Sequence, residues 1–135
     1  MNQKITIVGA GLTGSLLAIY MARHGFDIEV YERRPDIRNV KMSAGKSINL
    51  AISARGIHAL EQVGLAEEVL KTAVPMKGRL IHPVKGELSF QPYGKNENEY
   101  INSISRRELN CMLMNAAEKF PNIKIYFNQR CTGMD

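Results

Sequence analysis

The chain has 135 residues, which suits one domain that buries roughly two thirds of the surface of its unfolded chain. Its residues are 44% apolar and 23% charged, as in ordinary globular proteins, and no run of about 18 apolar residues predicts a membrane-spanning helix. The net charge of +5 comes from basic residues that are spread out apart from one cluster between Arg33 and Lys46, which has too few aromatic neighbours for a convincing nucleic-acid surface. A phosphate-bearing small molecule or a solvated loop would fit this cluster equally well. The two cysteines, Cys111 and Cys131, are too few for a disulfide framework and too isolated for a metal site, so we expect a reducing, cytoplasmic location.

The opening segment carries the most specific pattern. A largely apolar β-strand is predicted over 4–9 and a helix over 12–23, and their junction carries Gly9, Gly11 and Gly14 in the spacing Gly-x-Gly-x-x-Gly. Gly9 suits a tight turn, Gly11 lets the backbone approach a pyrophosphate, and Gly14 lets the helix pack closely on the strand. A second predicted strand, 28–32, ends at Glu32, whose carboxylate is placed to accept hydrogen bonds from a ribose.

This combination predicts a dinucleotide site. A glycine-rich turn in some other α/β protein would leave the position of Glu32, 18 positions after Gly14, without an explanation. A carboxylate at this position would repel the 2′-phosphate of NADP, which leaves FAD or NAD as the resident cofactor. The glycine motif itself does not distinguish between these two.

The remaining elements are predicted from apolar spacing, period-two alternation and turn residues. In chain order they are a polar loop (33–46), two helices (53–63 and 66–73), a β-hairpin (78–82 and 87–91, around a turn at 83–86), a strand (100–104), a helix (106–120) and a final strand (123–127).

The order of these elements predicts an α/β protein, a Rossmann-like FAD-binding domain with an inserted helical segment and β-hairpin, incomplete at its C-terminus. We divide it into a β-α-β dinucleotide unit (1–34), an insertion with loop, helices and substrate-side hairpin (35–104), and a returning helix and strand (105–135). An NAD domain would usually continue directly into a third strand, whereas such an insertion is typical of flavoproteins. A doubly wound sheet should also continue past the last strand, so we expect the front portion of a longer protein.

Four segments resemble the flavin monooxygenases of the para-hydroxybenzoate hydroxylase type and, within them, the kynurenine 3-monooxygenases. The wider group is indicated by the glycine turn together with Glu32-Arg33-Arg34-Pro35. The narrower family is indicated by three later motifs, which are Gly45–Ser53 followed by Arg55-Gly56, then Pro75–His82, and then Pro92-Tyr93-Gly94 leading to Ser103–Arg106. These motifs occur in order and span most of the chain.

The resemblance implies a set of residues that contact FAD, in addition to the three glycines. They are Thr13 at the phosphate turn, Tyr31, Glu32, Arg33 and Arg34 around the ribose, Ala51 near the flavin ring, Arg106 at the start of the last helix, and Cys131 through its backbone. The resemblance also implies that Arg79 and Tyr93 hold the amino-acid carboxylate of the substrate.

The residue types agree with these roles, although each has a plainer interpretation. The planar guanidinium of Arg79 suits bidentate recognition of a carboxylate, but a solvated strand arginine fits the sequence equally well. Tyr93 lies between a proline and a glycine, where a packed turn residue is the commoner role. Arg106 places a cation at a helix N-terminus, which is unfavourable and suggests a nearby anion; the alternative is a surface side chain bent towards Glu108.

The reaction implied by the resemblance is the hydroxylation of L-kynurenine to 3-hydroxykynurenine in tryptophan degradation, with FAD as cofactor, NADPH as reductant and O2 as the oxygen source. The implied reaction needs no metal, and no catalytic side chain is predicted, because nothing pairs His58 or His82 with a nucleophile. The 135-residue chain alone is expected to lack full activity. Two alternatives stay open: a flavin hydroxylase of another aromatic acid, and a non-catalytic module that binds FAD or NAD.

Overall fold

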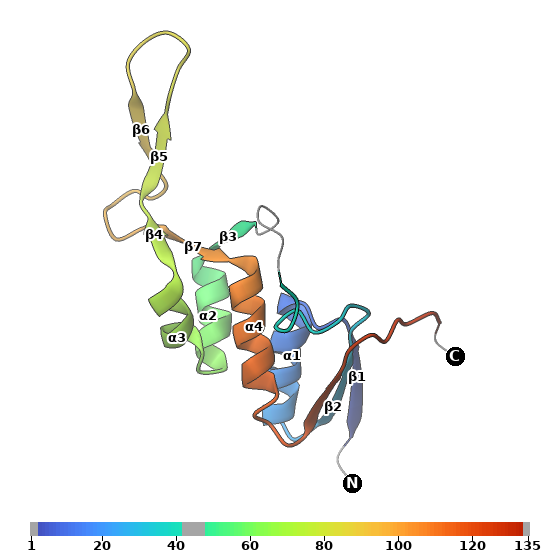
Figure 1. The fold of residues 1–135 in the computed structure, drawn as a ribbon. Helices are drawn as coiled ribbons and strands as arrows, with labels where there is room; N and C mark the ends of the chain where they lie inside the picture. Colours follow the sequence, from blue (N-terminus) through green and yellow to red (C-terminus); the bar gives the residue numbers. More distant parts are fainter. Residues whose placement is uncertain (1–2, 42–47, 134–135) are drawn as a thin grey trace. The chain divides into compact units, whose positions relative to one another are not determined.

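The computed structural model describes residues 3–41 and 48–133, which form two compact units (Figure 1). The first unit contains the described residues up to Ile48 and those from Arg106 onward, and the second runs from Asn49 to Ser105. Residues 45–47 of the Gly45–Ser53 motif and the last part of the predicted 33–46 loop lie outside the described residues.

A three-stranded parallel sheet forms the base of the first unit. β1 (Lys4–Val8) pairs with β2 (Asp27–Tyr31), and β2 pairs with β8 (Ile123–Tyr126), so the strand order is β1-β2-β8. Isoleucine and valine are frequent in these strands because branched side chains suit a pleated surface that is buried on one face. The sheet confirms both the predicted β-α-β start and the return of the last strand to the same sheet.

One helix covers this sheet and packs in turn against a second helix. α1 (Leu12–Arg23) packs on all three strands and against α4 (Arg106–Ala117), as Figure 1 shows. Ile19 of α1, Val30 of β2 and Leu113 of α4 are almost completely buried, and each such side chain stabilises the fold by about 1.5–3 kcal/mol. The predicted bounds of α1 are confirmed, and Gly25 follows the helix with a φ of 87°, as expected for a residue that ends a helix.

The loop that follows β2 is fastened to both ends of α4 by two arginines. Arg38 donates hydrogen bonds to Asp36 in the loop and to Glu118 after α4, at 2.6 Å in each case. Glu118 and Asp36 together raise the pKa of Arg38 above its ordinary value. Arg107 of α4 donates to two backbone carbonyl groups of the same loop. The segment directly after β2 is therefore anchored at several points.

The second unit contains a separate antiparallel sheet. β3 (Asn49–Ile52) and β4 (Val74–Met76) both pair with β7 (Ile101–Ser105), so the strand order is β3-β7-β4. α2 (Ala54–Gln62) packs against α3 (Ala66–Thr72) and on β3. The buried residues of this unit are Ile52, Leu60, Val69, Asn102 and Ile104.

A two-stranded hairpin also belongs to the second unit. β5 (Gly78–Ile81) pairs antiparallel with β6 (Ser89–Pro92), and Figure 1 shows this hairpin extending beyond β4. Gly78 is required by packing, because a Cβ atom there would lie 2.5 Å from the ring of Phe90. The predicted hairpin is confirmed, but its connecting segment comprises residues 82–88 and is longer than the predicted turn at 83–86.

Other sequence predictions are wrong in detail. Residues 49–52 and 74–76 form β3 and β4, which the sequence pattern does not predict because such short strands show no clear alternation and form by pairing with β7. The predicted helix 106–120 ends at Ala117, because the next amides at 119 and 120 bond to carbonyl groups three residues back, in the tighter geometry of a final turn. None of the described helices is both long and apolar enough to cross a membrane.

Candidate functional site

The glycine turn between β1 and α1 has the backbone geometry that its residues were expected to provide. Gly9 has a φ of 103°, a conformation that favours glycine, and its N–H donates to the carbonyl of Tyr31 at 2.8 Å. A Cβ atom on Gly14 would lie 1.9 Å from the carbonyl oxygen of Gly9, so only glycine lets α1 approach the turn this closely. At Gly11, by contrast, an added Cβ would meet no protein atom within 4 Å.

The N-terminus of α1 is suited to bind an anion. Gly11 is the N-cap residue and makes no side-chain capping bond, and the first turn contains no acidic residue. The first intrahelical hydrogen bond is from the Ser15 N–H to the Gly11 carbonyl, so the N–H groups of residues 12–14 precede the helical ladder. These N–H groups and the positive end of the helix dipole favour a phosphate.

Glu32 lies directly after β2 and connects the glycine turn to the next loop. It is 4% exposed, and its Oε2 accepts a hydrogen bond from the Ala10 N–H at 2.9 Å. Its Oε1 accepts from the backbone N–H of Arg34 at 2.9 Å and from Arg34 Nε at 3.0 Å. Burial acts to raise the pKa of Glu32, but these hydrogen bonds outweigh it and hold the pKa below its ordinary value. Because each carboxylate oxygen can accept two hydrogen bonds, Oε2 retains capacity for a ribose hydroxyl.

Part of the glycine turn and Glu32 border an open cavity of about 460 Å³ at the carboxyl edge of the parallel sheet, where ligands of α/β proteins commonly bind. The size lies within the range of small-molecule sites. Three arginines supply positive charge to it, while the buried Glu32 already has protein partners. The lining residues are Val8, Gly9, Gly11, Tyr31, Glu32, Arg33, Arg34, Gln129, Arg130 and Cys131. The arrangement fits the ADP half of a dinucleotide, with phosphates at the helix N-terminus and a ribose beside the carboxylate.

The structure brings most of the predicted cofactor residues to this cavity but not all of them. Thr13 and Gly14 lie in the first turn of α1 and do not line it. Arg106 is the first residue of α4; its side chain is exposed and makes no ion pair or hydrogen bond with the described residues. Cys131 lines the cavity after β8, whereas Ala51 lies in β3 of the second unit. The contact assigned to each of these residues stays a prediction.

The predicted substrate residues Arg79 and Tyr93 both belong to the hairpin of the second unit. Arg79 pairs with Gln91 across the hairpin, and its Nε donates to Gln91 Oε1 at 2.7 Å. Tyr93 directly follows β6, and its N–H donates to the carbonyl of Lys77 at 3.0 Å, which extends the hairpin pairing by one step. The structure therefore places Tyr93 opposite Lys77, two residues before Arg79.

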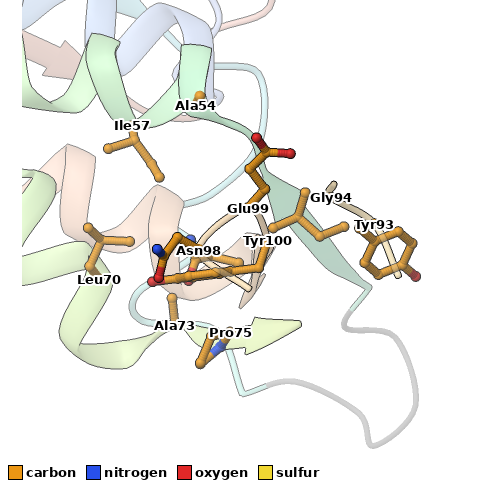
Figure 2. A pocket seen from close by; sticks show the side chains of 12 residues that line it. Ala54, Ile57, Leu70, Ala73, Pro75, Tyr93, Gly94, Asn98, Glu99 and Tyr100 are labelled. Carbon is orange, nitrogen blue, oxygen red and sulfur yellow. The ribbon is translucent and has the colours of Figure 1, made fainter. Parts of the chain in front are cut away.

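The second unit has a cavity of its own, of about 600 Å³. Its walls come from α2, α3, β4 and the segment before β7, and Figure 2 shows Tyr93 at one end, apart from Leu70 and Ala73. Tyr93 lines this cavity but Arg79 does not. The two predicted substrate residues therefore do not share this cavity.

Sequence reasoning missed several residues of the first site, namely the cavity-lining Val8, Gln129 and Arg130 and the supporting Asn110. Arg130 lines the cavity after β8, and the signal for it was its position beyond the carboxyl end of a parallel strand. Asn110 lies on the buried face of α4, and its Nδ2 donates to the carbonyl of Ala10 in the glycine turn at 3.1 Å. The signal for Asn110 was a polar residue within an otherwise apolar helix face.

Comparison with known proteins agrees with this geometry. A protein-family model described as an FAD binding domain matches residues 2–135. Relatives named kynurenine 3-monooxygenase are 57% identical over 99% of this chain in Myxococcus xanthus and 52% identical over 98% in Legionella pneumophila strain Corby. A third relative with this name, from Drosophila willistoni, is 48% identical over 97% of the chain. The chain spans only 29–30% of the length of these relatives.

Solved structures share the fold at lower sequence identity. A mutant of 2-methyl-3-hydroxypyridine-5-carboxylic acid oxygenase superposes with a TM-score of 0.74 at 20% identity, covering 95% of this chain and 32% of that protein. The p-nitrophenol 4-monooxygenase of Pseudomonas putida DLL-E4 superposes with a TM-score of 0.71 at 21% identity, covering 93% of this chain and 32% of that protein. At these identities the similarity concerns the fold alone, and it confirms the predicted α/β class.

Proposed function

This chain belongs to the FAD binding domain family, and we propose that it is part of an FAD-dependent monooxygenase that converts L-kynurenine to 3-hydroxykynurenine with NADPH and O2. The observation that carries the proposal is the similarity, over nearly the whole chain, to relatives named kynurenine 3-monooxygenase. Because the chain spans less than a third of their length, the activity is proposed for the complete protein, and the 135 residues alone are expected to lack it.

The first unit is proposed to hold the ADP half of FAD. The N–H groups at the start of α1 face the diphosphate, and Glu32 accepts a hydrogen bond from the ribose. Arg33 and Arg34 add positive charge beside the same cavity. When bound, FAD supplies the redox chemistry, since a flavin accepts hydride from NADPH and in its reduced form activates O2.

Arg79 and Tyr93 are proposed to bind the amino-acid carboxylate of L-kynurenine. Arg79 Nε donates its hydrogen bond to Gln91, so the two Nη groups are the donors that remain for a carboxylate. The Tyr93 side chain is 48% exposed and offers one hydroxyl group. The amino group on the ring of kynurenine makes the neighbouring carbon nucleophilic, so the task of the protein is to orient that ring and to exclude water.

The test uses the complete protein. Substrate-dependent NADPH oxidation is measured with L-kynurenine and with a panel of other aromatic acids, and the product is identified by chromatography. Formation of 3-hydroxykynurenine supports the proposal. Stimulation by another acid alone, with none by L-kynurenine, would contradict the substrate assignment while leaving a flavin hydroxylase.

A variant series tests the carboxylate site. Arg79→Ala should raise the KM for kynurenine about tenfold or more at normal flavin content, because a bidentate ion pair is lost. Arg79→Lys should recover only part of the loss, since an ammonium group cannot reproduce the planar fork. Lys85→Ala, which removes an exposed cation from the segment between β5 and β6, is the matched control and should leave KM unchanged. An unaltered KM in Arg79→Ala would place the carboxylate elsewhere.

A cytoplasmic location is proposed as well. It is supported by the sequence, whose two cysteines, Cys111 and Cys131, are too few for a disulfide framework. Fractionation of cells that express the complete protein tests this location, and recovery of the protein in an oxidising compartment or in membranes would contradict it.

A further inference from the structure

Asn110 is a buried polar residue whose presence packing alone does not explain. It lies in α4 between Leu109 and Leu113 and is 6% exposed. Its Nδ2 donates to the carbonyl of Ala10, while its Oδ1 is buried and makes no hydrogen bond to any of the described residues. An unsatisfied buried oxygen is costly, and an apolar side chain would avoid that cost. The bond to Ala10 is therefore the contact that an asparagine provides here and a leucine cannot.

That bond fixes the orientation of one peptide group in the glycine turn. The Ala10 carbonyl and the Gly11 N–H belong to the same peptide unit, and no peptide bond among the described residues is cis. In a trans peptide the C=O and N–H bonds point in opposite directions. Because Asn110 draws the carbonyl towards α4, the Gly11 N–H points away from α4, and Gly11 is a lining residue of the 460 Å³ cavity.

The turn needs such a restraint because glycine flanks Ala10 on both sides. Glycine permits a wide range of backbone angles, so the sequence Gly9-Ala10-Gly11 does not by itself fix the orientation of its peptide groups. Glu32 holds the preceding peptide through the Ala10 N–H at 2.9 Å, and Asn110 holds the following one through the Ala10 carbonyl. If the second peptide rotated, a carbonyl oxygen would replace an N–H donor beside the cavity, and it would repel a phosphate.

We propose that Asn110 is a positioning residue for the cofactor diphosphate: by holding the Ala10 carbonyl, it keeps the Gly11 N–H directed at the phosphate oxygens. The inference rests on the proposed binding of FAD by this unit and does not depend on the identity of the aromatic substrate. Asn110 itself lies behind the turn and acts through the backbone.

The test compares two asparagine variants of the complete protein. Asn110→Asp keeps the shape but replaces the donor with an acceptor that faces the Ala10 carbonyl. It should weaken FAD binding about tenfold or more, as for the loss of one hydrogen bond to a charged group. Asn122→Asp is the matched control, because Asn122 Nδ2 also donates to backbone carbonyls, those of Ala22 and Phe26, at 3.0 and 2.8 Å. It should lower the melting temperature without changing FAD affinity.

A spectroscopic measurement separates positioning from general loosening of the fold. The ³¹P resonances of the bound FAD diphosphate should shift in Asn110→Asp and keep their wild-type positions in Asn122→Asp. If Asn110→Asp does not fold, Asn110→Ala removes the same donor without adding a charge and is expected to show the same two effects. Wild-type affinity and unshifted ³¹P resonances in a folded Asn110 variant would overturn this inference alone. A wild-type protein that binds no FAD would overturn the proposed function as well.

Discussion

Replacing Glu32 by glutamine tests the proposed FAD site, because the Glu32 carboxylate is hydrogen-bonded to both the glycine turn and the loop after β2. The carboxylate accepts three hydrogen bonds, one from the Ala10 N–H and two from Arg34, and a ribose hydroxyl would be a fourth donor. Glutamine has nearly the same shape, but one of its two terminal groups is itself a donor. In Glu32→Gln, the amide NH2 group must therefore face a donor, either the Ala10 N–H and the ribose hydroxyl or the N–H groups of Arg34. We therefore expect FAD to bind more weakly.

The magnitude follows from the burial and charge of this group. Glu32 is 4% exposed, so solvent screens its hydrogen bonds little. A hydrogen bond to a charged group contributes about 1.5–3 kcal/mol, which corresponds to roughly a 10- to 150-fold loss of affinity. The assay is titration of the cofactor-free complete protein with FAD, followed by the quenching of flavin fluorescence. Glu29→Gln is the control, because Glu29 lies in β2, pairs with Lys4 and does not line the cavity, and its amide oxygen can still accept the hydrogen bond that Tyr31 donates.

The pH dependence provides a second readout with a defined sign. The pKa of Glu32 in the folded protein is below its ordinary value of 4.5, so its contribution to stability is complete above pH 4.5 and is lost as the pH falls through the depressed value. Protonation of Glu32 also removes the charged acceptor proposed for the ribose, so wild-type FAD affinity should decline as the pH falls through this depressed pKa, and Glu32→Gln should lack this part of the decline. An FAD affinity of Glu32→Gln equal to that of wild type and of Glu29→Gln would refute the assignment of the ribose to Glu32.

Three further predictions concern the backbone of the site and the loop after β2. Gly14→Ala should destabilise the protein by about 1–3 kcal/mol or more, because its Cβ would overlap the carbonyl of Gly9. Gly11→Ala should leave the melting temperature unchanged but weaken FAD binding, because its methyl group meets no protein atom and lies beside the cavity. A lower melting temperature with unchanged FAD affinity would contradict the site geometry. Arg38→Ala should lower the free energy of unfolding in urea by about 1–3 kcal/mol, because two carboxylates lose their shared partner, whereas the exposed Arg55→Ala should not; equal effects would show that the loop anchor contributes nothing.

Much of the first unit could be predicted from sequence because its signals are local. The apolar strand, the glycine spacing and the acidic residue after the second strand lie within 35 residues, and each reports a short-range constraint on backbone or packing. The structure has α1 at its predicted bounds, Gly9 at positive φ and Gly14 in contact with the turn. Alternation and turn residues likewise indicated the hairpin, although its loop is longer than predicted.

In the second unit, two short strands and the register of the hairpin could not be predicted from local sequence patterns. β3 and β4 have four and three residues, too few for a period-two pattern, and they form because β7 supplies hydrogen-bonding partners on both of its edges. The pairing of Arg79 with Gln91 also depends on the register of the hairpin, and the sequence did not fix that register. Such features arise from pairing between segments, so no single segment encodes them.

The sequence by itself determined that a phosphate-binding turn precedes a helix and that a carboxylate follows the second strand, because glycine conformation and helix ends depend on neighbouring residues. Only the tertiary structure decided what surrounds that turn. Pairing of β8 with β2 brings residues 129–131 to the cavity, and packing of α4 on α1 brings Asn110 to Ala10 across 100 positions of sequence. These contacts depend on burying the apolar faces of elements far apart in the chain, which no local pattern specifies.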